Sequence, residues 1–350
     1  MADEIERLKA EAERYRSMKV KSAAAEKLFE ASTRLRDKGE DAEAIRLLTQ
    51  AIKLYEDEGS ESVEGFLEKA APVLDSLSQP KLAAETYLEA AKQHLHRKDH
   101  RGAIPVYLKA ADAYRRANVF QEVAESLRAV AEEYRTLSEP LLAAEHVEKE
   151  ASARLQINDA RGASSALRDA RDLYVGAGHF DEAARCLMKA AEVLVQAGNN
   201  REGDRILLQA AEDLQSAADE STRTGDHNQA DHLLSEAAAI YEKAKQPAEA
   251  SRCHARAAEE EVKKGDMSGA AEDFRKAAID RLLAGDLEGA RGIIDSVKND
   301  EVRKTTAFKQ SSTLLEIFEK GDEGRLNAML KEINDFSWVR LCLAFGKLAR

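Results

Sequence analysis

Histidine and cysteine side chains can bind a metal or attack a substrate, but their spacing in this chain supports neither chemistry. His94 and His96 are two residues apart and therefore point to different sides of a helix. The chain has no phosphate-binding loop and no glycine-rich dinucleotide turn. The remaining candidates lack a second ligand pair or a partner carboxylate at a suggestive offset: Cys253, His254, His227 and His232. We therefore predict no catalytic residue, no metal site and no cofactor, and a protein that is not an enzyme.

The composition indicates a cytoplasmic protein. Three widely spaced cysteines, Cys186, Cys253 and Cys342, each lie inside a helical pattern, which is typical of buried free thiols in a reducing compartment. The N-terminus lacks the apolar core of a signal peptide, and no stretch approaches about 18 uncharged apolar residues. The net charge of −12 argues against general nucleic-acid binding, because affinity for phosphate depends on many Lys and Arg contacts.

The elements that carry these side chains repeat with a period of about twenty residues. Apolar positions at offsets 0, 4, 7, 11 and 14 form the stripe of an amphipathic helix. The first column of the repeat holds Ala83, Ala103, Val123, Ala143, Ala163 and Ala183. The blocks close at Asn118, Asn158, Gly178 and Gly198. Each block is thus predicted to be one helix of about four to five turns with a tight connection.

Two blocks make a unit of about 40 residues, longer than the tetratricopeptide unit of about 34 residues. Pairs of alanines in each block resemble the small residues that let tetratricopeptide helices approach closely. We predict an all-α fold: a right-handed solenoid of antiparallel helix pairs, tetratricopeptide-like, over residues 1–297. The repeat ends near Val297, and residues 298–350 are predicted to form a C-terminal helical bundle that caps the solenoid. Its helices are expected over 308–318, 326–333 and 338–348.

At three places the sequence departs from the regular repeat, and each departure predicts a local feature. The pattern slips by seven residues around 218–228, close to two helical turns, so we expect a longer helix pair with a loop over 224–228. Pro72 predicts a kink or a helix that begins only after it. Gly39 is predicted to end a helix in the left-handed conformation.

The two ends of the chain resemble the soluble NSF attachment proteins (SNAPs), adaptors of SNARE-complex disassembly. The stretch FKQSSTLLEIFEKGDEGRLNAMLKEINDFSWVRLCLAF resembles the family's C-terminal bundle, in which a helix ending in Leu-Leu-Glu is followed by a short helix and an apolar Trp-containing helix. The N-terminal LKAEAERYRSM resembles the family's first helix. About the last seventy residues are specific to the family, whereas the middle would match many helical-repeat proteins.

The resemblance implies that the C-terminal end recruits a hexameric AAA ATPase of the NSF type. Glu316 and Glu319 match acids that would face the basic N-domain of that ATPase. Lys320 departs from the family, which tends to have an acid there, and Asp322 and Glu323 restore the charge. Leu348 resembles the leucine needed to stimulate ATP hydrolysis, although the usual acidic tail is missing here.

The resemblance also implies that the solenoid lies along a SNARE-type coiled-coil bundle. Distributed Lys and Arg side chains would hold such an acidic bundle by charge and shape. We predict this basic set to be Arg97, Lys98, Arg115, Arg116, Arg154 and Arg171. Four basic residues near the N-terminus have two interpretations, ordinary solvated charge and a contact with anionic membrane lipid: Arg14, Arg16, Lys19 and Lys21. The family's membrane-binding loop, rich in Phe, Leu and Gly, is replaced here by SMKVKS, so at most a weak peripheral contact is expected.

Two other readings stay open at this stage. A general tetratricopeptide-like scaffold, unrelated to membrane fusion, would bind partners through its groove alone, whereas the adaptor needs its groove and its C-terminal cap. A purely structural role would show saturable binding to neither partner. Such regular repeats without an acidic tail also fit a divergent or prokaryotic relative, in which the partners would differ.

Overall fold

The computed structural model describes residues 2–57, 63–332 and 345, and every regular element in these ranges is an α-helix. The chain divides into two compact units, residues 1–177 and 178–350. The first unit contains α1 (Ala2–Ser17), α2 (Lys21–Asp37), α3 (Asp41–Glu56), α4 (Val63–Ser76), α5 (Pro80–His96), α6 (His100–Arg116), α7 (Phe120–Thr136), α8 (Pro140–Gln156) and α9 (Ala160–Gly176). The second contains α10 (Phe180–Gln196), α11 (Asn200–Thr224), α12 (His227–Lys243), α13 (Pro247–Lys264), α14 (Met267–Ala284), α15 (Leu287–Ser296), α16 (Asp300–Lys304), α17 (Thr306–Lys320) and α18 (Glu323–Glu332).

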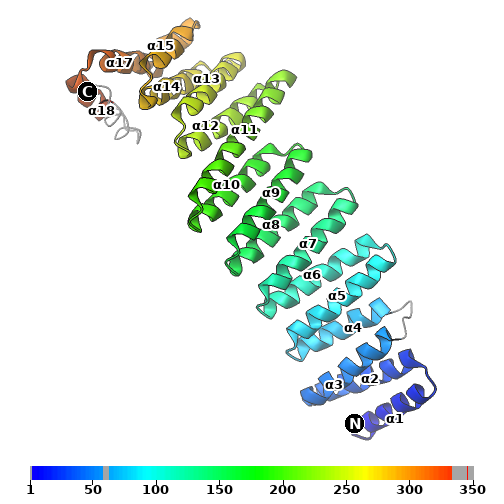
Figure 1. The fold of residues 1–350 in the computed structure, drawn as a ribbon. Coiled ribbons are helices and arrows are strands. Elements are labelled where there is room, and N and C mark those ends of the chain that lie inside the picture. Colours follow the sequence, from blue (N-terminus) through cyan, green and yellow to red (C-terminus); the bar gives the residue numbers. More distant parts are fainter. Residues whose placement is uncertain (1, 58–62, 333–344, 346–350) are drawn as a thin grey trace. The chain divides into compact units, whose positions relative to one another are not determined.

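Within each unit, each helix packs mainly against the helices before and after it, and neighbours run antiparallel (Figure 1). The predicted all-α solenoid of tetratricopeptide-like helix pairs is thereby confirmed. No helix among the described residues is both long and apolar enough to cross a membrane.

The twenty-residue period sets where the helices begin. Successive helices start at Pro80, His100, Phe120, Pro140, Ala160, Phe180 and Asn200. Six of them, α5 to α10, are each 17 residues long. Each connection contains one residue with φ between 57° and 82°: Ser78, Lys98, Asn118, Ser138, Asn158, Gly178 and Gly198. Glycine adopts this left-handed conformation freely because it has no Cβ, and asparagine tolerates it because its side chain can hydrogen-bond locally. The serines and Lys98 adopt it at a small cost.

Alanine makes the close contacts between helices. Ala83, Ala103, Ala143 and Ala163, from the first column of the repeat, are fully buried. Tyr114 and Tyr174, at offset 11 of the repeat, are also buried, as their position on the apolar stripe predicts. Because the buried side chains are small, each helix buries little apolar area by itself, and stacking on both neighbours supplies the core.

The slip near 218–228 has a simpler form than the predicted pair of longer helices. The α11 helix alone is extended, to 25 residues, and it ends at Gly225 with φ of 82°. The following α12 keeps 17 residues. The prediction for Pro72 was wrong in one of its two forms, because α4 begins nine positions earlier, at Val63, and continues through the proline to Ser76. Gly39 has φ of 79°, which confirms the left-handed helix end.

The regular pattern of helix lengths changes near residue 297. Val297 is extended after α15 and is followed by the short α16, which the sequence pattern did not predict. The α17 helix covers the predicted segment 308–318 and extends it at both ends. The α18 helix covers residues 326–332 of the predicted segment 326–333, and residue 333 lies outside the described residues. The predicted helix over 338–348 lies outside the described residues, except for Phe345, whose ring packs edge-on against Phe318. The boundary at 297 between solenoid and cap remains a prediction.

Candidate functional site

The basic set predicted to hold a coiled coil lies wholly in the first unit, and its arginines already have acidic partners. Arg97 pairs with Glu64 of α4. Arg116 donates two hydrogen bonds to Asp75, at 2.8 and 3.2 Å. The other pairs are local: Arg115 with Asp112, Arg154 with Glu150 and Asp159, and Arg171 with Asp172. A partner of this surface therefore competes with acids of the chain itself, and such exchange costs little where the pair is exposed.

Exposure divides the basic set into two groups. About half of the side-chain surface of Arg97, Arg115 and Arg116 is accessible, at 49%, 51% and 51%. Arg154 and Arg171 are only 14% and 18% exposed. The first group can reach a partner while keeping its apolar stem packed.

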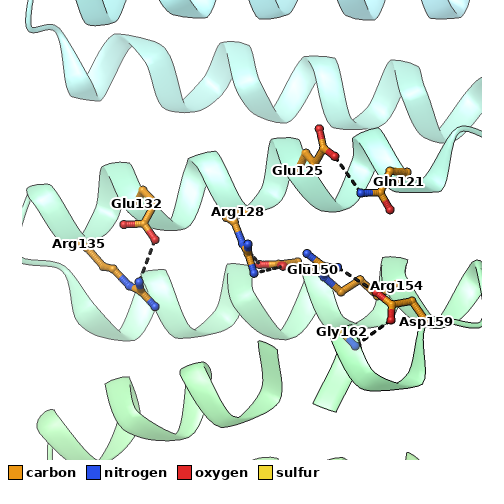
Figure 2. A network of polar contacts seen from close by, with 9 residues as sticks. All are labelled: Gln121, Glu125, Arg128, Glu132, Arg135, Glu150, Arg154, Asp159 and Gly162. Carbon is orange, nitrogen blue, oxygen red and sulfur yellow. Dashed lines mark hydrogen bonds and ion pairs between the residues drawn. The ribbon is translucent and has the colours of Figure 1, made fainter. Parts of the chain in front are cut away.

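Arg154 belongs to a network inside the first unit. Figure 2 shows Arg128 of α7 and Arg154 of α8 reaching the carboxylate of Glu150 from opposite sides. The Glu150 side chain is 1% exposed, so both arginines compensate a carboxylate that has left water. Arg154 also donates to Asp159 at 3.0 Å, and Asp159 caps α9 by accepting the N–H of Gly162 at 2.9 Å. The Gly162 N–H, together with the Arg154 guanidinium, holds the pKa of Asp159 below its usual range.

A hollow between α6, α7 and α8 lies next to Arg115 and was not predicted. It measures about 320 Å³, and its walls carry two basic side chains, Arg115 and Lys149, around an apolar floor. The floor includes Phe120, Val123 and Ala153. Lys149 is exposed and makes no ion pair with any described residue. The hollow thus combines an apolar recess with two accessible positive charges at its rim.

A buried histidine on the same helix as Lys149 carries no positive charge of its own near pH 7. His146, of α8, stacks on Tyr134 with ring centroids 5.4 Å apart. Burial, with the added repulsion of Lys149, lowers the pKa of His146 to about 4. The ring is therefore neutral near pH 7, and the positive charge at this place belongs to Lys149 and Arg115.

The acidic set predicted to recruit an ATPase lies in the second unit, on α17 and at the start of α18. Glu316 is 55% exposed and has Lys320 at 3.7 Å, one turn along α17. Glu319 accepts two hydrogen bonds from Arg291 of α15, at 2.7 and 3.1 Å. Asp322 accepts the N–H of Arg325 at 3.0 Å, and Glu323 is exposed at the first position of α18. Leu348 lies outside the described residues.

The N-terminal basic residues surround the connection between α1 and α2. Arg14 and Lys19 are exposed, Arg16 pairs with Glu13 at 2.8 Å, and Lys21 donates to the Asp57 carbonyl at 3.2 Å. Two apolar side chains of the same connection, Met18 and Val20, are also exposed. The segment therefore presents positive charge beside apolar surface.

Metal-ligand geometry was missed by reasoning from the sequence. Among the described residues, three groups of His, Asp and Glu side chains hold their ligand atoms within 4.8 Å of one another. One of them joins His254, dismissed above, to Glu242 and Asp280. These residues are 12 and 26 positions from His254, and only the packing of three helices brings them together.

Comparison with solved structures returns helical-repeat proteins at low similarity. A circular tandem repeat protein has 13% identity and a TM-score of 0.41, covering 99% of this chain and 94% of that one. A signal transduction ATPase with a tetratricopeptide repeat sensor, from Pyrococcus horikoshii, has 13% identity and a TM-score of 0.34, covering 93% and 55%. The TPR2AB domain of yeast Sti1, solved as a complex with Hsp90, has 15% identity and a TM-score of 0.27, covering 89% and 100%. No curated protein sequence matches the chain.

The helical repeats and the exposed charged surfaces define an adaptor or scaffold for other proteins. The family model described as soluble NSF attachment protein, SNAP, matches residues 116–287, from the end of α6 to the start of α15. Over these residues the chain is similar to the SNAP family. The match covers the central repeats, which the sequence analysis considered unspecific, and is therefore independent of the two ends that carried the resemblance.

Proposed function

We propose that this protein is a SNAP-like adaptor, cytoplasmic and without catalysis of its own, that binds a SNARE-type coiled coil and recruits an NSF-type AAA ATPase to disassemble it. The observation that carries the proposal is the family match over the central repeats. The charged sets described above give each partner a candidate contact. A weak peripheral membrane contact through Arg14, Arg16, Lys19 and Lys21 is part of the same proposal.

The coiled coil is proposed to contact the accessible part of the basic set, extended by one residue. Arg115 and Arg116 are the last two residues of α6, and Lys149, from the middle of α8, lines the same hollow as Arg115. Their positive charge complements the acidic surface of a SNARE-type bundle, and the hollow beside them accepts an apolar side chain. Arg97 and Lys98 extend the basic set in the connection between α5 and α6. Arg154 and Arg171 contribute less, because their side chains are mostly buried.

The ATPase is proposed to contact Glu316, Asp322 and Glu323, with Glu319 and Leu348 as further candidates. Exposed carboxylates attract a basic domain at long range and thereby raise the association rate. Glu319 would have to be shared with Arg291, which holds it with two hydrogen bonds.

A matched pair of double charge reversals tests the coiled-coil contact. In R115E/K149E, two charges beside the hollow change sign, and we expect at least about tenfold weaker binding to a SNARE-type bundle, with a smaller salt dependence. The control R205E/R223E reverses two exposed arginines of α11 that form the same kind of local ion pair as Arg115. Equal losses in both variants would contradict the proposed contact.

A general tetratricopeptide-like scaffold is the second candidate. The hollow favours it, because an apolar recess with basic flanks also suits a short acidic peptide. A scaffold of that kind would bind such peptides without any contribution from α17 and α18. Binding of single acidic peptides, with no affinity for a four-helix bundle, would put this candidate first.

A further inference from the structure

Three ligand-type side chains converge inside the second unit, on three consecutive helices. Glu242 is near the end of α12, His254 is in the first half of α13, and Asp280 is near the end of α14. The side chains of His254 and Asp280 are each 6% exposed, whereas Glu242 is 41% exposed. The cluster is therefore buried on two sides and opens to solvent at Glu242, which gives a path of entry for a small ion.

The ligand atoms lie within 4.8 Å of one another, and the two distances from His254 Nε2 are close to those around a bound metal ion. His254 Nε2 lies 3.3 Å from Glu242 Oε1 and 4.0 Å from Asp280 Oδ2. Zinc bonds to nitrogen and oxygen of about 2.0–2.2 Å, arranged tetrahedrally, separate neighbouring ligand atoms by about 3.3–3.5 Å. The first distance meets this requirement, and the second needs a shift of about 0.5 Å, which a rotation of a carboxylate supplies.

The second nitrogen of the imidazole, Nδ1, has a carboxylate near it but outside hydrogen-bond distance. His254 Nδ1 is buried and has no hydrogen-bond partner, and the nearest carboxylate oxygen, Asp273 Oδ1, is 3.8 Å away. A metal on Nε2 fixes the ring proton on Nδ1, and metal-binding histidines almost always donate that proton to a carboxylate or carbonyl. Asp273 is itself 6% exposed and is held by Lys276 at 2.7 Å, so its carboxylate is already oriented. A small closure of α13 onto α14 would complete this hydrogen bond.

We propose that Glu242, His254 and Asp280 bind one divalent transition-metal ion, with Zn²⁺ as the best match. One imidazole and two carboxylates suit a borderline ion better than Ca²⁺ or Mg²⁺, which prefer oxygen ligands alone. With three protein ligands, the fourth position is left for water, on the side of Glu242. The ion would join α12, α13 and α14 into one rigid body next to the helices that are proposed to contact the ATPase. The proposal stands independently of the adaptor function and departs from the sequence-based expectation of no metal site.

The two other groups are weaker candidates. Asp231, Glu261 and Asp273 contain no imidazole, and lysines already neutralise two of the three carboxylates, at 2.7 Å each. The third group, Asp181, His232 and Glu236, is mostly exposed, so water competes for each ligand. Among these three groups, only the one at His254 contains a buried histidine with an unpartnered nitrogen.

The test measures metal binding by the full chain, produced without a histidine tag and stripped with a chelator. Zn²⁺ alone is added, and bound metal is counted by equilibrium dialysis and elemental analysis. We expect one ion per chain, a higher Tm with Zn²⁺ than without it, and visible absorption bands when Co²⁺ replaces Zn²⁺. H254Q and D280N should each lose the bound ion, and D273N should bind it about 10–100-fold more weakly, as is typical when a hydrogen-bond partner of a ligand is lost.

The control is H146Q. His146 is as buried as His254 and also has an unpartnered Nδ1, but it belongs to none of the metal-ligand groups found among the described residues. H146Q should therefore keep the ion. E242Q separates loss of metal binding from a folding defect, because Glu242 is partly exposed. This variant should have the same Tm as the metal-free unaltered chain and should not bind Zn²⁺. If the unaltered chain takes up no Zn²⁺, or if H254Q and E242Q bind it as well as the unaltered chain, the contact is only a hydrogen bond and the proposal is wrong.

Discussion

Arg154 Nε lies 2.9 Å from Glu150 Oε1, one turn earlier on α8, and this pair is part of the interior of the first unit. Sequence reasoning placed Arg154 on a partner-binding surface. The structure gives its guanidinium two carboxylates of the chain itself, Glu150 and Asp159, and leaves little of it in water. Its predicted contact with a coiled coil remains untested, and stability is its more direct role.

Replacing Arg154 with methionine should therefore lower stability more than it lowers binding. Glu150 would keep only Arg128, so we expect a loss of about 2–3 kcal/mol in the free energy of unfolding, below the about 3–5 kcal/mol of a completely broken buried pair. Chemical denaturation measures the change. R115M removes an exposed pair and should cost less than about 1 kcal/mol. A larger loss in R115M than in R154M would contradict the assignment of the two arginines.

The cap of α9 predicts opposite effects for two Gly→Ala substitutions in one helix. A Cβ at Gly162 would lie 2.0 Å from Asp159 Oδ2 and 2.7 Å from the Arg154 guanidinium, so the cap must break or shift. Loss of an N-cap costs about 1 kcal/mol, and more is expected here because Arg154 moves too. At Gly176 nothing lies within 4 Å of a Cβ, and G176A should stabilise the helix by up to about 1 kcal/mol. Thermal unfolding of both variants measures the two effects. Equal changes in Tm would contradict the role of Asp159 as the cap of α9.

Glu261 predicts a pH dependence of stability. Burial, and then the nearby Asp273, Asp231 and Asp266, raise the pKa of this carboxyl to about 7, against a small opposing effect of Lys264. Because the folded pKa lies above the unfolded value of 4.5, folding favours the protonated form. This contribution is complete below pH 4.5 and is lost as the pH rises through about 7.

The variant E261Q should accordingly have a higher Tm than the unaltered chain at pH 8 and an equal Tm at pH 4.5. Glutamine keeps the shape of the side chain but cannot ionise, so the difference between the two proteins isolates the charge. Thermal unfolding at several pH values, at constant ionic strength, gives the profile. A difference that grows as the pH falls would have the wrong sign for this account.

Charge reversal of the acidic set should separate the two proposed partners. In E316K/E323K, two exposed carboxylates of α17 and α18 change sign, and we expect ATPase recruitment to be lost while binding to the coiled coil is retained. Co-sedimentation with each partner measures both. E319K carries the same change but also breaks the pair with Arg291, so a Tm measurement must accompany it. Equal effects on the two partners would show that the assumed polarity of the adaptor is wrong.

Much of the fold could be predicted from the sequence, because its information is local. Column residues recur every twenty positions, and helices and left-handed connections follow the same spacing from Pro80 onward. The sequence-based predictions fail where packing against a neighbouring helix determines the local structure. Pro72 stays within α4, since a proline costs less where the helix is held by buried residues on both sides of it.

The residue types of the candidate site could be predicted from the sequence, but the ion pairs between these residues could not. Arg97 and Glu64 are 33 positions apart, and Arg116 and Asp75 are 41 apart, so no local pattern connects them. The same holds for His254, because Glu242 and Asp280, which lie near it, are on the helices before and after its own. Lys149 was missed for the opposite reason. As a lone lysine on an exposed face it has no signal of its own, and the hollow beside it exists only in three dimensions.

ATP turnover by an NSF-type ATPase, with this protein and a SNARE-type four-helix bundle from the same organism, tests the adaptor function most directly. The account predicts stimulation that requires both additions, persists in R205E/R223E, and is lost in R115E/K149E, in E316K/E323K and on replacement of Leu348 by alanine. Turnover that is unchanged by the protein, although the bundle binds it, would contradict the adaptor function and leave a helical-repeat scaffold.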